Sequence, residues 1–100
     1  MAKKVVLSQV AKNKLSDLLE HLEEKWSAKV KQDFIVKLDK SISRVSHYPK
    51  SCPESYEIPG LFKCVVTRQT SLLYRVKAEE IEIVTLFDTR QNPKKLNKSK

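Results

Sequence analysis

Three short runs near the C-terminal end of the chain decide the fold: Phe62-Lys-Cys-Val-Val-Thr67, Ser71-Leu-Leu-Tyr-Arg-Val-Lys77 and Ile81-Glu-Ile-Val-Thr-Leu-Phe87. Each run is rich in β-branched and aromatic residues and alternates with a period of two, which is typical of a strand. Only three residues separate each run from the next. Gaps this short join antiparallel neighbours, so the runs predict a three-stranded antiparallel meander.

The residues before the meander predict one strand and two helices. Lys4–Leu7 has the composition of a short strand, and Ser8 follows it as a helix N-cap. Apolar residues then recur at steps of three and four in two stretches: Ala11, Leu15, Leu18, Leu19, Leu22 and Trp26, then Val30, Phe34, Ile35, Leu38, Ile42 and Val45. The link at Ser27 is very short, so the two amphipathic helices should form an antiparallel hairpin ending near Tyr48, before Pro49.

The predicted order is therefore β-α-α-β-β-β, an α+β fold with the helical hairpin packed on one face of the sheet. A single domain should cover residues 1–95, followed by a basic C-terminal tail at residues 96–100. Prolines and the single glycine, Gly60, mark residues 49–60 as an irregular connection between the helices and the meander. The second sheet face is left open, so its side chains should decide the function.

Strict alternation assigns the two faces of the last run. It places Ile81, Ile83, Thr85 and Phe87 on one face, opposite Glu82, Val84, Leu86 and Asp88. Four aromatic residues stand at spacings expected of a core rather than of a surface that stacks bases: Trp26, Phe34, Phe62 and Phe87.

Composition excludes several classes of protein. A Walker loop, a dinucleotide-binding GxGxxG and a GxSxG nucleophile elbow each need at least two glycines, and the chain has one. Its two cysteines, Cys52 and Cys64, are too few for a CxxC…CxxC zinc site or a disulfide scaffold. With no pattern of a signal peptide or membrane span, we expect a cytoplasmic chain with reduced thiols, and we expect no cofactor or metal. A disulfide between the two cysteines stays open.

The net charge of +8 points to an anionic partner, which is nucleic acid, an acidic protein or a membrane surface. Alternation places Lys63 and Arg75 on the open face of the sheet, with Arg68 and Arg90 at its rim. A basic strip of this kind attracts phosphates or carboxylates. We expect the target or partner to bind a set of six cations: Lys63, Arg68, Arg75, Arg90, Lys94 and Lys95.

The sequence resembles the RelE/ParE toxin superfamily over residues 3–95. The most specific segments are Leu73-Tyr-Arg-Val76 and Phe87-Asp-Thr-Arg-Gln-Asn-Pro93. The resemblance implies a small cytoplasmic toxin that is neutralised by an antitoxin encoded beside it. It also implies one of two targets, because RelE-like members cleave messenger RNA in the ribosomal A site, whereas ParE-like members inhibit DNA gyrase without cleaving RNA.

The residues favour the ParE-like branch. Cleavage of RNA by its 2′-hydroxyl needs a base, an acid and a cation on the scissile phosphate. RelE-like enzymes usually have basic residues where this chain has Val65 and Ser71, and they end with a tyrosine, whereas no tyrosine follows Tyr74. In a metal-independent endoribonuclease, four residues would stabilise charge without titrating near neutrality: Lys63, Arg68, Arg75 and Arg90. The RelE-like ribonuclease remains the alternative, so whether the chain is an enzyme is left open.

Two further hypotheses concern the binding partner. A non-catalytic nucleic-acid-binding module is a second alternative, because the charge and the basic tail suit phosphate backbones. A membrane-surface role fits less well, since the polar face of the first helix carries Glu20, Glu23 and Glu24.

An acidic antitoxin segment is expected along the hairpin and the sheet, with its acids paired to Lys63, Arg75 or Arg90. A homodimer or a heterotetramer with the antitoxin is left open.

Overall fold

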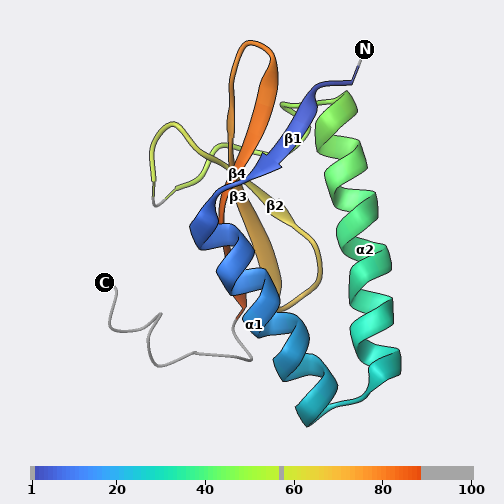
Figure 1. Ribbon diagram of the computed structural model, residues 1–100. Coiled ribbons are helices and arrows are strands. Elements are labelled where there is room, and N and C mark those ends of the chain that lie inside the picture. Colours follow the sequence, from blue (N-terminus) through green and yellow to red (C-terminus); the bar gives the residue numbers. More distant parts are fainter. Residues whose placement is uncertain (1, 57, 89–100) are drawn as a thin grey trace.

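The computed structural model describes residues 2–56 and 58–88. Its elements are β1 (Lys4–Leu7), α1 (Gln9–Lys25), α2 (Ala28–His47), β2 (Phe62–Val65), β3 (Thr70–Val76) and β4 (Glu80–Asp88) (Figure 1). The four strands form one sheet in the order β1-β4-β3-β2, in which β2, β3 and β4 are antiparallel and β1 is parallel to β4. The α+β fold, its element order and the meander are therefore confirmed, while the expected tail at residues 96–100 lies outside the described residues.

Ser8 joins three of these elements. Its side chain accepts a hydrogen bond from Ala11 N at 3.0 Å, so it caps α1 as predicted. Its own hydroxyl donates to Val84 O at 2.6 Å, and its backbone N–H donates to Ile83 O at 3.0 Å. Ser8 thus ends β1, begins α1 and attaches both to β4. Ser27 caps α2 in the same way, by accepting from Val30 N at 3.1 Å.

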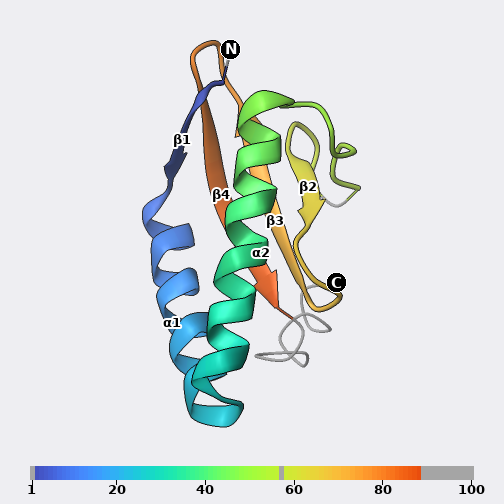
Figure 2. The same ribbon diagram turned by 90° about the vertical axis from the view of Figure 1, so that its right-hand side faces the viewer.

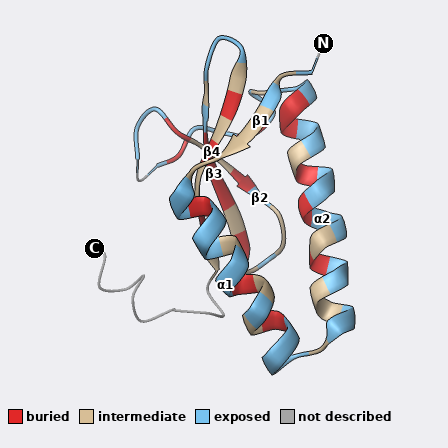
Figure 3. Ribbon diagram, viewed as in Figure 1, coloured by how far each residue is buried: buried red, intermediate tan, exposed pale blue. Residues whose placement is uncertain are grey.

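Both helices cover one face of the sheet, and the core lies between the two layers (Figure 2). Buried positions on the helices and the sheet face one another (Figure 3). Tyr74, on the central strand β3, is fully buried, stacks on Phe62 at 5.5 Å between ring centroids and donates its hydroxyl to Pro49 O at 2.7 Å. No helix in the described parts of the chain is long and apolar enough to cross a membrane.

The prediction that Trp26 belongs to the core is wrong. Trp26 is the C-cap of α1 and is 59% exposed. Because α1 ends at Lys25, Trp26 belongs to the turn between the helices, and this turn lies beyond the end of the sheet (Figure 1). The predicted strand Phe62–Thr67 is also too long, because Val66 and Thr67 turn back and donate their backbone N–H groups to Thr70 O.

A β-bulge corrects the predicted faces of β4. Leu73 pairs with Thr85, but the next residue, Tyr74, pairs with Ile83, so Val84 is an extra residue in β4. Beyond this point the two faces exchange: Leu86 joins Ile81 and Ile83 in the core, while Thr85 and Phe87 turn to the open face. Strict alternation assigns these three residues to the wrong faces because it has no place for an inserted residue.

The core position that the bulge gives to Leu86 can be tested by mutation. Leu86 is 4% exposed, so Leu86→Ala should lower the free energy of unfolding by about 2–5 kcal/mol through lost burial and a cavity. Val36→Ala on the exposed side of α2 is the matched control, and it should change stability by less than about 0.5 kcal/mol. Urea unfolding followed by circular dichroism measures both, and equal effects would place Leu86 outside the core.

Candidate functional site

Two of the predicted cations lie on the sheet face away from the helices. Lys63 on β2 is half-buried and opposite Leu73, and Arg75 on β3 is exposed and opposite Glu82. Arg75 Nη1 lies 3.4 Å from Glu82 Oε1, and Lys77 Nζ lies 3.4 Å from the same oxygen. Within residues 2–56 and 58–88, Lys63 makes no ion pair, so its charge is available to a ligand, whereas Arg75 shares the Glu82 carboxylate with Lys77.

Of the other predicted cations, Arg68 is the one that the structure describes. Arg68 is exposed in the turn between β2 and β3, beyond the end of β2. Arg90, Lys94 and Lys95 lie outside the described residues. The structure therefore brings Lys63 and Arg75 onto one face of the sheet, and it places Arg68 at the end of the adjacent turn.

The open face is apolar near its middle. Leu73 lies on this face and is nevertheless fully buried, while its diagonal neighbour Val65 is 60% exposed. Val65 stands directly opposite Ser71 in the register of β2 and β3. These uncharged residues lie beside Lys63, so the face is not a continuous basic strip.

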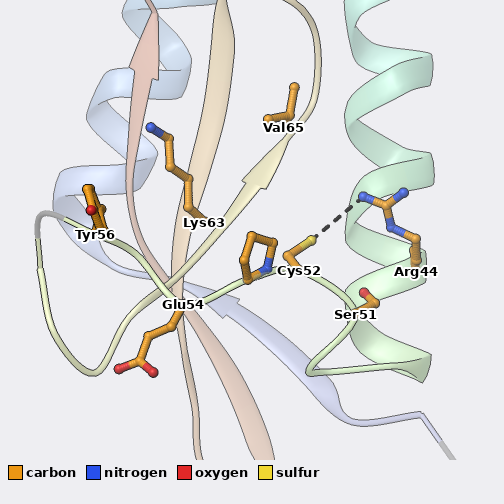
Figure 4. A pocket seen from close by; sticks show the side chains of 8 residues that line it. Arg44, Ser51, Cys52, Glu54, Tyr56, Lys63 and Val65 are labelled. Atoms are coloured by element: carbon orange, nitrogen blue, oxygen red, sulfur yellow. Dashed lines mark hydrogen bonds between the residues drawn. The ribbon is translucent and has the colours of Figure 1, made fainter.

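A pocket of about 800 Å³ opens at the outer edge of β2 (Figure 4). Its walls come from α2, from the irregular segment and from β2: Arg44, Ser51, Cys52, Pro53, Glu54, Tyr56, Lys63 and Val65. Glu54 Oε2 accepts a hydrogen bond from Gly60 N at 3.1 Å, which engages the one carboxylate among these lining residues. With cations from α2 and β2 and no histidine among these lining residues, the pocket is suited to binding an anionic group rather than to moving a proton.

The irregular segment is held against β2 by backbone pairing. Ser55 N donates to Leu61 O at 2.6 Å, Lys63 N donates to Pro53 O at 2.9 Å, and Glu54 and Phe62 form an antiparallel bridge. This pairing covers part of the outer edge of β2, and it holds Glu54 and Cys52 at the pocket.

Arg44 is a residue that sequence reasoning misses. Its Nη2 lies 2.9 Å from Cys64 Sγ and 3.7 Å from Cys52 Sγ, and both cysteines are buried free thiols. The hydrogen bond to Cys64 raises the pKa of Arg44 further, so the guanidinium stays charged. The sequence gives only a weak indication of these contacts. Position 44 follows the buried Ser41 by three residues, which places it beside the apolar stripe of α2.

Burial governs the ionisation of the neighbouring groups. It raises the pKa of the Cys64 thiol to about 11, and the contact with Cys52 adds to this effect, against the opposing influence of Arg44. Burial likewise raises the pKa of Tyr74. No group of three or more potential metal ligands occurs in the part of the chain that the structure describes. The histidines lie on the helices, His21 half-buried on α1 and His47 exposed at the end of α2.

The arrangement matches that of solved toxin structures. No protein-family model and no curated protein sequence matches the chain. A structure of the chromosomal ParDE toxin–antitoxin system from P. aeruginosa is similar at 16% identity and a TM-score of 0.73, over 87% of this chain and 96% of that chain. The E. coli DinJ–YafQ toxin–antitoxin complex is similar at 8% identity and a TM-score of 0.62, over 92% and 98%.

A third similar structure is the RelBE2 toxin–antitoxin complex from Mycobacterium tuberculosis, at 16% identity and a TM-score of 0.59, over 88% of this chain and 99% of that chain. At such low identity the likeness is one of fold. The resemblance to the RelE/ParE superfamily is therefore confirmed at the level of the fold.

The raised pKa of Cys64 predicts a loss of stability at alkaline pH. Between about pH 9 and about pH 11 the unfolded thiol loses its proton while the folded thiol keeps it, which favours the unfolded state. The free energy of unfolding should therefore fall through this window by on the order of 2 kcal/mol from this group. Urea unfolding of the wild type and of Cys64→Ser, which does not titrate, should show a smaller fall in the variant. Equal falls would contradict this account.

Proposed function

We propose that this chain, which has the fold of the RelE/ParE toxins, is the toxin of a type II toxin–antitoxin system, with DNA gyrase as its target in the manner of ParE. The proposed target surface is the open face of the sheet beside the pocket, with Lys63 as its main cation. The solved structures that the chain resembles belong to toxin–antitoxin systems, which supports the toxin assignment.

The observation that carries the choice of target is the cross-strand pair Val65 and Ser71. The two residues are direct neighbours in the register of β2 and β3, on the same face as Lys63. They stand at the positions where RelE-like enzymes usually have basic residues. A ribonuclease site there would have Lys63 to stabilise charge, but Val65 and Ser71 supply neither a second cation nor a group that exchanges protons near neutrality.

An antitoxin is the proposed protein partner. Val36 on the outer side of α2 is 45% exposed, and an apolar side chain there suits a partner segment lying along the helical hairpin. Acidic side chains of that segment would pair with Lys63 more readily than with Arg75, because Arg75 already faces Glu82.

The RelE-like ribonuclease is the second candidate, and one observation favours it. Arg44 and Lys63 line the same pocket from two sides, and cations placed in this way are suited to holding an RNA phosphate. In this case the proton transfers would have to involve groups supplied by the ribosome.

The gyrase target is tested with the purified chain. We expect it to inhibit ATP-dependent supercoiling of relaxed plasmid DNA by gyrase, and we expect Lys63→Glu to weaken this inhibition by about tenfold. The matched control is Lys4→Glu, which makes the same charge change on the exposed edge strand β1, at the opposite edge of the sheet. It should alter inhibition by less than about twofold.

The same proteins are added to translating ribosomes. Codon-specific cleavage of messenger RNA, with gyrase unaffected, would replace the ParE-like assignment with the ribonuclease. Salt-sensitive binding to bare DNA or RNA, with neither activity, would support the nucleic-acid-binding module instead.

Antitoxin binding gives an independent prediction. The candidate is the protein encoded by the adjacent reading frame, and its affinity is measured by calorimetry at two salt concentrations. Lys63→Glu should lower the affinity by about tenfold and reduce its dependence on salt, since one charge pair is lost. Lys4→Glu should leave both unchanged, and equal effects of the two variants would remove Lys63 from the interface.

A further inference from the structure

Two cysteines from different segments meet beneath one arginine. Cys64 belongs to β2, and Cys52 belongs to the irregular segment after α2. Arg44 Nη2 contacts both sulfur atoms, Cys64 Sγ at 2.9 Å and Cys52 Sγ at 3.7 Å (Figure 4 shows Arg44 extending towards Cys52). The two buried thiols are therefore neighbours that share one guanidinium nitrogen.

The backbone register supports a covalent link between them. Glu54 and Phe62 form an antiparallel bridge that lies between two backbone hydrogen bonds, so they are a non-hydrogen-bonded pair. Beyond this bridge, Lys63 N donates to Pro53 O at 2.9 Å, and Cys52 and Cys64 are the residues next to these two in the chain. Residues that face one another on paired backbone segments have Cα atoms about 4.5–5.5 Å apart, within the span of about 4.4–6.8 Å that a disulfide bridges.

We propose that Cys52 and Cys64 are a redox-active dithiol that a hydroperoxide converts to an intramolecular disulfide, fixing the irregular segment to β2. Cys52 is the attacking residue, because it lines the open pocket and is 6% exposed, whereas Cys64 is fully buried. Arg44 is a positioning residue, because its guanidinium contacts both sulfur atoms.

The reaction has two steps. The Cys52 thiolate attacks one oxygen of hydrogen peroxide, the O–O bond breaks, and the leaving hydroxide takes up the thiol proton to give water and a sulfenic acid. The Cys64 sulfur then attacks the Cys52 sulfur, the S–O bond breaks, and a second water leaves with the Cys64 proton. Two thiols lose two electrons and two protons, and one peroxide becomes two waters. Burial holds Cys64 protonated at neutral pH, since its pKa is about 11, so the second step should be faster in alkali.

The link would act on the pocket. Cys52 and Glu54 lie on the segment that forms one wall, and Pro49 at its start accepts the hydrogen bond from the buried Tyr74. A disulfide would add a covalent link to the backbone hydrogen bonds that already hold this wall against β2, so oxidation would fix the wall of the pocket more firmly. This inference goes beyond the toxin assignment and does not depend on it.

Peptide mapping tests the proposal on the full-length chain. The reduced protein is treated with hydrogen peroxide, blocked with an alkylating reagent and digested with trypsin without a reductant. Cleavage after Lys63 separates the two cysteines into peptides 51–63 and 64–68. We expect these two peptides to be joined, the intact mass to fall by two hydrogen atoms, and dithiothreitol to reverse both changes.

Thermal unfolding and matched variants complete the test. Oxidation should raise the Tm of the wild type by on the order of 10 °C and leave that of Cys52→Ser unchanged. Arg44→Gln should slow formation of the link by about tenfold, because it removes the cation that contacts both sulfur atoms. Separate peptides that carry added oxygen, or links between two chains, would overturn the proposal. Because the wild-type map is decisive on its own, a variant that fails to fold does not affect the conclusion.

Discussion

The hydrogen bond from the Tyr74 hydroxyl to Pro49 O connects the centre of the sheet to the start of the irregular segment. A phenol in the core must satisfy its hydroxyl, and here the partner is the backbone just beyond the end of α2. The bond thereby positions the chain that follows, which pairs with β2 and brings Cys52 and Glu54 to the pocket. The position of the pocket wall thus depends on the hydrogen bond that the buried Tyr74 hydroxyl makes with Pro49.

Charge on this molecule is more localised than its net value suggests. The excess of +8 includes cations on the sheet that already face carboxylates, as Arg75 and Lys77 face Glu82. Lys63 and Arg44 lie at the pocket instead, where Glu54 is engaged with the backbone of Gly60. A ligand would therefore meet two cations beside the exposed apolar side chain of Val65, a combination that suits a protein segment with acidic and apolar residues.

Local chemistry explains which features the sequence predicts. The element order, both N-caps and the end of α2 depend on periodicity, on Ser8 and Ser27, and on Pro49, and all of them are local signals. The bulge at Val84 has no such signal, because valine suits a regular strand as well as a bulged one, so the faces of Thr85, Leu86 and Phe87 follow only from pairing with β3. The role of Arg44 needs the three-dimensional structure, since its partners belong to segments that come together only after folding.

The attachment of Ser8 to Val84 has a consequence for biosynthesis. The two residues are 76 positions apart, and β1 pairs only with β4 within the sheet that the structure describes. During translation, the first strand therefore has no partner until the last strand of the meander has left the ribosome. Completion of the sheet depends on this late, long-range pairing, which is slow compared with helix formation. A nascent chain interrupted before Glu80 would contain both helical segments but would lack β4, the strand that pairs with both β1 and β3.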